Sequence, residues 1–307
     1  MDTITQLVLL SLAAGTPLVF AALGELVVEK SGVLNLGVEG MMLVGAIASF
    51  IVAAHTQSPW LGVAAGALAA AALSVIFAVV ALSLRANQVA TGLALSLFGV
   101  GLSAFIGRDY SSVVIEGITP VSMPALSGIP VVGRLLFGHN PLVYLSLALF
   151  AGVQWFLYHT RAGLVLRAVG EAPQSANAIG YRVIAIRYAA VVFGGACAGL
   201  GGAYLAIAYT PSWVEGMTAG RGWIALALVV FATWRPLRVL VGAYLFGGVM
   251  ITQLFLQGSG AQIDIPSQFL TSLPYWATII VLVLISRNLQ TIRLNSPVSL
   301  GQPYRPE

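Results

Sequence analysis

Residues 40–84 read GMMLVGAIASFIVAAHTQSPWLGVAAGALAAAALSVIFAVVALSL, a run of 45 positions without a single Asp, Glu, Lys or Arg. A helix needs about 20 apolar residues to cross the hydrocarbon core of a membrane. The run is long enough for two crossings, and the stretch 55–59, His-Thr-Gln-Ser-Pro, marks the turn between them. The sequence therefore predicts a membrane-spanning pair of helices here.

The rest of the chain has the same character. Apolar residues make up 59% of the 307 positions and charged residues only 8%, whereas a soluble domain carries about 25% charged residues. This composition excludes a soluble enzyme and a disordered tail, and it makes the lipid bilayer the surroundings of most of the protein. The net charge of +4 comes from basic residues scattered over loops, so we expect no nucleic-acid partner.

The charge-free stretches predict an all-α, polytopic membrane helix bundle that forms one transmembrane domain over residues 1–307. About nine spans, in a range of eight to ten, are expected, and the seventh is a span only if Arg221 lies at or inside the membrane edge. The spacing Gly195-x-x-x-Gly199 favours close helix packing. The expected spans are 4–24, 38–54, 60–84, 87–107, 141–160, 188–208, 219–234, 239–257 and 270–286.

Arginine decides the predicted orientation, because cytoplasmic loops are enriched in basic residues. With loop 161–187 in the cytoplasm, the tail 287–307 is also cytoplasmic. Nine spans place the N-terminus outside, unless 25–39 re-enters the membrane. The outer loop 108–140, rich in Gly, Pro and Ser, is predicted to form a lid with a short interfacial helix at 131–137. The cytoplasmic face then collects ten arginines, namely Arg85, Arg161, Arg167, Arg182, Arg187, Arg235, Arg238, Arg287, Arg293 and Arg305, and the outer face three, namely Arg108, Arg134 and Arg221.

The first informative polar segment is 24–40, GELVVEKSGVLNLGVEG. It nearly matches the phosphate-binding pattern G-x-x-x-x-G-K-S/T, but Glu29 stands where the second glycine must be, and a carboxylate there would repel a phosphate. Two interpretations stay open. Either irregular backbone breaks the run of helices and lines a cavity or a protein interface, with Asn35 and Glu39 as its polar groups, or the segment is an ordinary loop in which Lys30 pairs with a nearby glutamate.

The second segment is EAPQSANAIG, at 171–180 within the long cytoplasmic loop. A proline in the first turn, an acid beside it and a glycine at the end predict a short capped helix of about two turns. So short a helix cannot cover its own small residues. It either docks into a groove of a soluble partner or lies on the lipid surface. The positions concerned are Glu171, Ala172, Pro173, Ala176 and Gly180.

Two span starts carry polar residues. Asn87 is expected to cap its helix by accepting a hydrogen bond from a free amide of the first turn. Gln88 and Thr91, three positions apart on one face, could line a polar path. Near the predicted outer edge, Arg221 either snorkels to lipid headgroups or faces a polar route, with Trp223 beside it.

Enzyme motifs are absent from the sequence. No H-E-x-x-H or G-x-S-x-G pattern occurs, and the three histidines lie at predicted span ends. The single cysteine, Cys197, allows no disulfide framework and no thiol metal cluster. We expect no catalytic residue, metal ion or cofactor. Glu39 and Asp264 are candidates for a proton relay, which makes an ion-coupled secondary transporter of a small polar solute the alternative function.

Three segments together resemble a known family: GVLNLGVEGMM at 32–42, the stretch 166–180, and GRGWIALA at 220–227. They are similar to permease subunits of bacterial ABC importers, in the branch that serves branched-chain amino acids, ribose-like sugars and nucleosides. The match is closest to the simple-sugar and nucleoside permeases that work with basic-membrane-protein-type lipoproteins. The resemblance covers nearly the whole chain.

The resemblance implies a multi-pass protein of the bacterial inner membrane without enzymatic activity of its own. The implied partners are two ABC ATPase subunits that hydrolyse ATP, a second permease chain in a homodimer or heterodimer, and an extracytoplasmic substrate-binding lipoprotein. Residues 171–180 would then be the coupling helix that contacts the ATPase.

The candidate path residues suit a small neutral solute with hydroxyl groups, a nucleoside first or a simple sugar. They offer amide, hydroxyl and aromatic groups with one carboxylate and one guanidinium, whereas a divalent ion needs several converging carboxylates. These candidates are Asn35, Glu39, Gln88, Thr91, Arg221 and Trp223.

Overall fold

The computed structural model describes residues 3–120, 138–258 and 295–305, together with isolated positions between 259 and 294. Within those ranges the chain forms helices joined by irregular segments and no β-strand, which confirms the predicted all-α class. The helices are α1 (Thr3–Lys30), α2 (Val38–Thr56), α3 (Pro59–Ala78), α4 (Gln88–Gly107), α7 (Pro141–His159), α8 (Arg161–Glu171), α9 (Pro173–Ala178), α10 (Val183–Ala203), α11 (Arg221–Phe231) and α12 (Pro236–Gly258), with π-helical continuations of α3 over Val79–Ser83 and of α10 over Tyr204–Tyr209.

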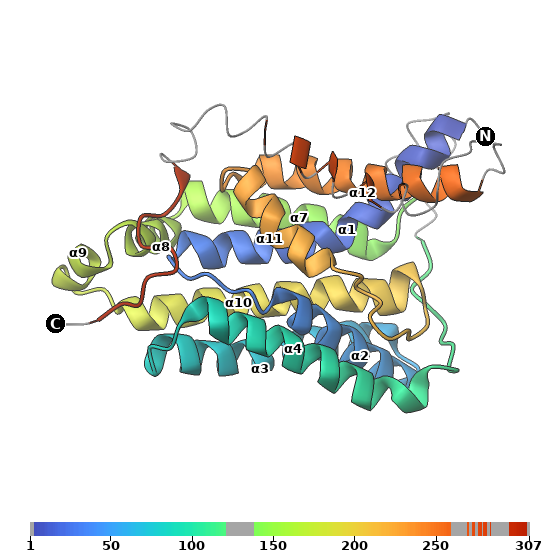
Figure 1. Ribbon diagram of the computed structural model, residues 1–307, viewed down its shortest axis with the longest axis horizontal. Coiled ribbons are helices and arrows are strands. Elements are labelled where there is room, and N and C mark those ends of the chain that lie inside the picture. The colour runs from blue at the N-terminus through green and yellow to red at the C-terminus, as the bar shows by residue number, and fades with distance from the viewer. Residues whose placement is uncertain are drawn as a thin grey trace.

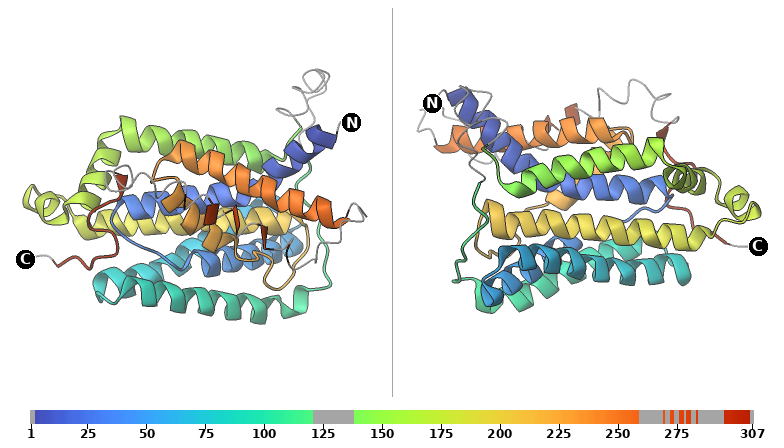
Figure 2. Two further views of the ribbon diagram at one scale, coloured as in Figure 1. Left: turned by 45° about the horizontal axis from the view of Figure 1, so that its top comes forward. Right: turned by 180° about the vertical axis from the view of Figure 1, so that it is seen from behind.

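Seven helices in the described ranges are long and apolar enough to cross a membrane, namely α1, α2, α3, α4, α7, α10 and α12. They run side by side along the long axis of the molecule (Figures 1 and 2). α8, α9 and the C-terminal segment gather at one end, and the N-terminal end of α1 lies at the other. This is the architecture of a multi-pass membrane protein.

The centre of the bundle is formed by α1 and α10. α1 packs against α12, α10 and α11, and α10 packs against α3 and α2. Positions 14–30 of α1 are all buried, which explains why the helix is apolar on every side as far as Gly24. Glycine allows the closest approach: a Cβ atom on Gly45 would lie 2.6 Å from the Gly199 Cα atom. The predicted role of Gly195-x-x-x-Gly199 in helix packing is thus confirmed at Gly199.

Seven of the nine expected spans correspond to a long helix. The seventh expected span, 219–234, is instead α11, whose 11 residues extend only about 16 Å and are too short to cross the core. The ninth, 270–286, lies outside the described residues apart from isolated positions, and so does the interfacial helix expected at 131–137. The count of about nine is therefore not confirmed.

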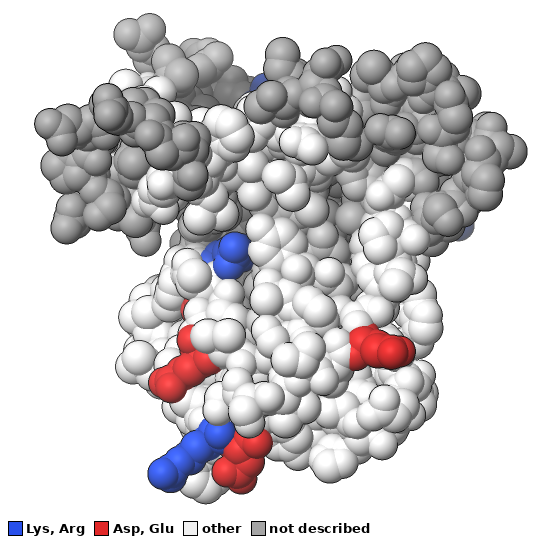
Figure 3. Space-filling model, turned by 90° about the vertical axis from the view of Figure 1, so that its right-hand side faces the viewer, with Lys and Arg blue, Asp and Glu red and all other residues white. Residues whose placement is uncertain are grey.

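The described part of the outer loop, 111–120, packs onto the segment that follows α10. The Ile115 amide donates to the Pro211 carbonyl at 3.3 Å, and Asn140 Nδ2 donates to the Ile118 carbonyl at 2.6 Å. The described surface at this end carries few Lys and Arg side chains (Figure 3).

Candidate translocation site and coupling helix

The connection between α1 and α2 is irregular and mostly buried. The Leu34 amide donates to Gln88 Oε1 at 2.8 Å, and the Ser96 hydroxyl donates to the Leu36 carbonyl at 2.8 Å. A Cβ atom on Gly92 would lie 2.6 Å from the Leu36 amide nitrogen, so glycine permits this approach. Gln88, Gly92 and Ser96 all belong to α4, and the connection therefore runs along the first turns of that helix.

This connection places the start of α2 inside the bundle. Gln88 and Ser96 are eight positions apart, which corresponds to about 12 Å of helix. Irregular backbone is tolerated at such depth only where protein or water satisfies its polar groups, and here α4 side chains do so. The structure agrees with the interpretation of a break at a protein interface. Lys30 Nζ donates to the Asn295 carbonyl at 2.7 Å, and its charge also interacts with Glu171 and Glu29, as the ordinary-loop interpretation expects of a nearby glutamate.

Asn35 shapes the turn that leads into α2. Its side-chain Oδ1 accepts a hydrogen bond from the Gly37 backbone amide at 2.9 Å, and the Asn35 backbone amide donates to Glu25 Oε1 at 3.1 Å. Asn35 and Glu25 are both buried. A carboxylate of α1 thus holds the broken segment on the side away from α4.

Glu39, the second residue of α2, accepts three hydrogen bonds. Its Oε1 accepts from the Thr218 hydroxyl at 2.6 Å and from the Gly220 amide at 2.9 Å, and its Oε2 accepts from the Gly222 amide at 2.6 Å. These amides belong to the start of α11, where N–H groups lack partners within the helix and the helix dipole favours a negative charge. The starts of α2 and α11 therefore meet around one buried carboxylate.

Arg221 and Trp223 flank this junction on α11. Arg221 Nη1 donates to the carbonyls of Met217 and Thr218 at 3.2 and 3.1 Å. Its Nε atom is buried and has no hydrogen-bond partner among the described residues. The arginine thus folds back on the loop before α11, whereas Trp223 is 39% exposed on the helix surface.

The start of α4 adjoins the break. Asn87 Oδ1 accepts from the Ala90 amide at 3.0 Å, which confirms the predicted helix cap. Gln88 is buried and holds the broken segment. The Thr91 hydroxyl donates to the Asn87 carbonyl of its own helix at 2.8 Å.

The structure brings together four of the six predicted path residues. Asn35 and Gln88 lie along the broken segment, and Glu39 and Arg221 lie at the start of α11. These four are engaged mainly with backbone groups, so their place in a translocation path stays a prediction. The remaining two residues, Thr91 and Trp223, take part neither in the contacts of the broken segment nor in those around Glu39.

The short helix predicted at 171–180 is present as α9. Ala172, with φ −143° and ψ 78°, separates it from α8, and Pro173 is its first residue. Gly180 follows in the left-handed region, with φ +95°. One detail is corrected: Glu171 is the last residue of α8 and does not cap α9.

α9 is attached to the rest of the protein along one side. Ala176 is buried in a small cluster with Val169, Val183 and Tyr304. The other side of α9 projects from the end of the molecule (Figure 1), and Ile179, just after it, is 73% exposed. The exposed side is therefore free for a partner.

The sequence did not reveal the role of the C-terminal segment 295–305. Arg187, expected among the loop arginines, is buried, and its Nη2 donates to Ser299 Oγ at 3.0 Å. Arg187 Nε donates to the Ser31 carbonyl at 3.1 Å, and Ser299 Oγ donates to the Gly170 carbonyl at 2.7 Å. The segment thus connects α8, α10 and the end of α1. No local sequence pattern predicts this role, because the partners of the segment are more than a hundred positions away in sequence.

A second unforeseen contact holds the far end of α11. Trp234 Nε1 donates to Glu29 Oε2 at 2.5 Å, and both residues are buried. Thr233 and Trp234 have φ values of +50° and +52°, a conformation that costs a non-glycine residue on the order of 1 kcal/mol. The indole–carboxylate bond stabilises a strained loop.

Seven long apolar helices, two helix starts that meet inside the bundle and a short projecting helix are features of a polytopic membrane protein. Residues 7–286 match the family described as branched-chain amino acid transport system / permease component, and the chain belongs to this family.

Three relatives align with nearly the whole chain. A putative glucose ABC transporter permease of Haloferax volcanii is 42% identical, over 96% of this chain and 95% of its own length. A nucleoside ABC transporter permease of Lactococcus lactis is 36% identical, over 92% and 93%. A guanosine ABC transporter permease of Bacillus subtilis is 32% identical, over 96% and 94%. The resemblance seen in the sequence is confirmed: the chain is the membrane permease subunit of an ABC transport system, whose ATPase is a separate partner.

Proposed function

We propose that this chain forms half of the translocation path of an importer for a small neutral solute with hydroxyl groups, a nucleoside or a simple sugar. The observation that carries the proposal is the full-length similarity to relatives named for glucose, nucleoside and guanosine transport. The junction of α2 and α11 supports it, because three donors compensate the Glu39 carboxylate. Such a junction does not offer a bare charge to a cation.

In this proposal the chain lies in the inner membrane with α9 and the C-terminus in the cytoplasm. α9 docks onto the ATPase, a second permease chain, identical or different, completes the path, and a binding lipoprotein delivers solute at the opposite end. Ala176 of α9 packs against Tyr304, and the Gln302 carbonyl accepts from Gln88 Nε2 at 3.5 Å. The C-terminal segment thus offers a physical connection from the coupling helix to the start of α4.

The ion-coupled alternative rests on Glu39 or Asp264. Glu39 accepts hydrogen bonds from three protein donors, so both of its carboxyl oxygens are engaged within the fold. Asp264 lies outside the described residues. Membership of an ABC permease family favours the ATP-driven system.

Uptake assays test the solute class. Cells would express the chain with its ATPase, partner permease and binding protein, and uptake of labelled uridine, adenosine, ribose, glucose and leucine would be compared. We expect uptake of nucleosides or of sugars. Strong leucine uptake without nucleoside or sugar uptake would overturn the proposal.

ATPase docking is tested on the exposed side of α9. Ile179→Asp combined with Glu171→Arg changes the charge of two exposed residues that flank α9, and it leaves the buried Ala176 in place. We expect copurification of the ATPase to fall about tenfold, the effect of losing about 1.4 kcal/mol of binding free energy. Val298→Asp, at a residue that is 71% exposed on the C-terminal segment, is the control. Equal ATPase recovery from both variants would remove the docking role.

A further inference from the structure

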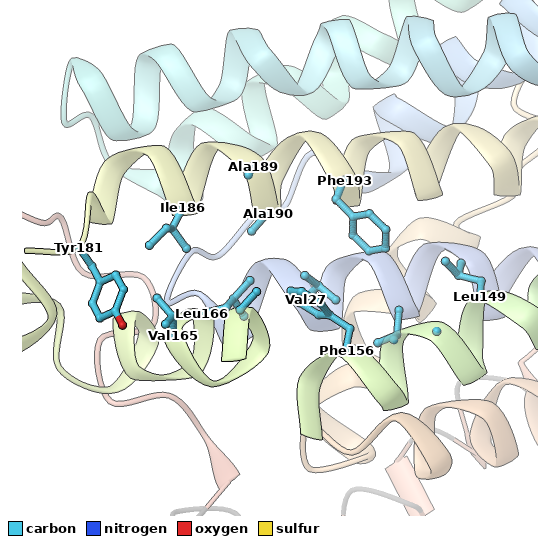
Figure 4. Close-up of a pocket in the computed structure, with 13 residues that line it drawn as sticks. Val27, Leu149, Phe156, Val165, Leu166, Tyr181, Ile186, Ala189, Ala190 and Phe193 are labelled. Atoms are coloured by element: carbon cyan, nitrogen blue, oxygen red, sulfur yellow. The ribbon is translucent and has the colours of Figure 1, made fainter. Parts of the chain in front are cut away.

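An apolar groove lies between α1, α7, α8 and α10, near the α9 end of the bundle. Its volume is about 680 Å³. Figure 4 shows Phe193 of α10 and Phe156 of α7 pointing into the space between the helices, with Tyr181 at the end of the groove. Only Tyr181, of the thirteen residues that line the groove, has a polar side-chain atom.

Small residues make the groove hollow. Gly152 of α7 has no atom within 4 Å of the position that its Cβ would occupy, and Ala189 and Ala190 line the opposite wall from α10. An apolar wall without a partner forgoes dispersion contacts. A groove of this size between membrane-crossing helices therefore favours an apolar occupant, and lipid chains surround it.

Two arginines distinguish this groove. Arg161 precedes the lining residue Ala162, and Arg182 follows the lining residue Tyr181. Both arginines are exposed, and neither side chain forms a hydrogen bond or ion pair with another described residue. Glu171, the acidic residue of this loop, is at the other end of α8, about 15 Å from Arg161 along the helix. Each arginine is thus one position from a residue that lines the groove, which brings two positive charges near it.

A second apolar groove provides a comparison. It is lined by residues of α1 and α12 and by four residues between positions 273 and 280, and it has a volume of about 820 Å³. None of its lining residues adjoins an arginine in the sequence. A large apolar groove is thus not unique to one place in this protein. The groove beside α8 differs from the second groove because two arginines without side-chain partners adjoin its lining residues.

We propose that the groove beside α8 binds a phospholipid with a net negative headgroup. One acyl chain lies along the walls formed by α7 and α10, where burial of its methylene groups favours binding. The phosphate lies at Arg161 and Arg182, as basic residues at the cytoplasmic membrane surface attract anionic lipids. α8 is both a wall of this site and the helix that leads to α9. The binding does not depend on which solute is transported.

Native mass spectrometry of the purified transporter complex tests the proposal. Phosphatidylglycerol and phosphatidylcholine with the same acyl chains would be added separately, and retained lipid per chain would be measured. We expect one tightly held phosphatidylglycerol per permease chain, with about tenfold stronger retention than phosphatidylcholine. Equal retention of the two lipids by the wild type would contradict the headgroup assignment.

Glycine substitutions provide a matched pair for the groove itself. Gly152→Leu fills the groove with a side chain that meets no atom at its Cβ, and it should abolish phosphatidylglycerol retention. Gly101→Leu places the same side chain on α4, at a position whose Cβ also meets no atom within 4 Å, and it should retain the lipid. Equal retention by these two variants would overturn the site.

The arginine pair gives an independent test that leaves the groove intact. Arg161→Gln with Arg182→Gln should lower phosphatidylglycerol retention to the level of phosphatidylcholine. Both side chains are exposed, so folding and ATPase recovery should not change. Undiminished preference for phosphatidylglycerol in this double variant would show that the lipid is held elsewhere.

Discussion

The two ends of α11 are held by two buried carboxylates in different ways. At the start of the helix, Glu39 of α2 accepts hydrogen bonds from a hydroxyl and from the amides of Gly220 and Gly222. After the end of the helix, Glu29 of α1 accepts from the Trp234 indole, its single side-chain donor among the described residues. α11 is thus fixed to two different helices, α2 at one end and α1 at the other.

The difference lies in what the donors are. Amides at a helix start are held in place by the helix itself, so no rotamer change can withdraw them from Glu39. The donor to Glu29 is a side chain on a residue in the left-handed region, next to Thr233 in the same conformation. The start of α11 should therefore tolerate substitution less well than its end.

The largest effect is expected for Gly222→Val. A Cβ atom at Gly222 would lie 2.5 Å from the Glu39 Cα and 2.6 Å from the Glu39 amide nitrogen. Both are backbone atoms that cannot rotate away, so we expect a loss of about 3 kcal/mol or more and little folded protein. Chain recovered from membranes as a monodisperse complex measures this. Gly101→Val is the control, and normal recovery of both variants would contradict the tight junction.

The next effect is expected for Glu39→Ala. Removal of the carboxylate leaves the Thr218 hydroxyl and the two α11 amides without their acceptor, at a cost of about 2–3 kcal/mol. Glu39→Gln keeps one acceptor oxygen, so its melting temperature and uptake should lie between those of Glu39→Ala and the wild type. A Glu39→Ala complex that melts and transports like the wild type would show that the cap at α11 is dispensable.

Local signals explain which features the sequence could predict. The run at 40–84 predicts two helices because it is long and free of charge. Asn87 predicts a cap because its side-chain oxygen accepts from an amide only three residues further on. Pro173 and Gly180 predict a short helix because proline fixes its own φ at a helix start and glycine permits the positive φ that ends a helix. In all three cases the interacting groups are close in sequence.

The junction could not be predicted in this way. The stretch 219–234 is apolar enough to be read as a span, but its helix begins only at Arg221. There the Gly222 amide donates to the Glu39 carboxylate, and these two residues are 183 positions apart in sequence. The same limit applies to Arg187, which the sequence pattern places in a loop. Its partners, 156 and 112 positions away, are visible only in the fold.

A smaller effect is expected at the other end of α11. Trp234→Phe keeps the aromatic packing but leaves the buried Glu29 carboxylate without its donor, at a cost of about 1–2 kcal/mol. Glu29→Leu combined with Trp234→Phe removes both polar partners and should recover part of that loss. Melting temperatures of the purified complexes measure both. A double variant that is less stable than Trp234→Phe alone would show that the Glu29 carboxylate has another stabilising partner.

The smallest effect is expected for Asn87→Ala, at a helix start that faces the surface. Its Oδ1 satisfies one amide of α4, as Glu39 satisfies two of α11, but water can replace the lost acceptor because Asn87 is exposed. We expect a loss of about 1 kcal/mol, unchanged uptake, and nearly full stability in Asn87→Asp, which retains an acceptor oxygen. Melting and uptake of the two variants decide. If Asn87→Ala abolished uptake while the complex stayed folded, the start of α4 would belong to the translocation path. An exposed helix start would then be as important for transport as the buried start of α11.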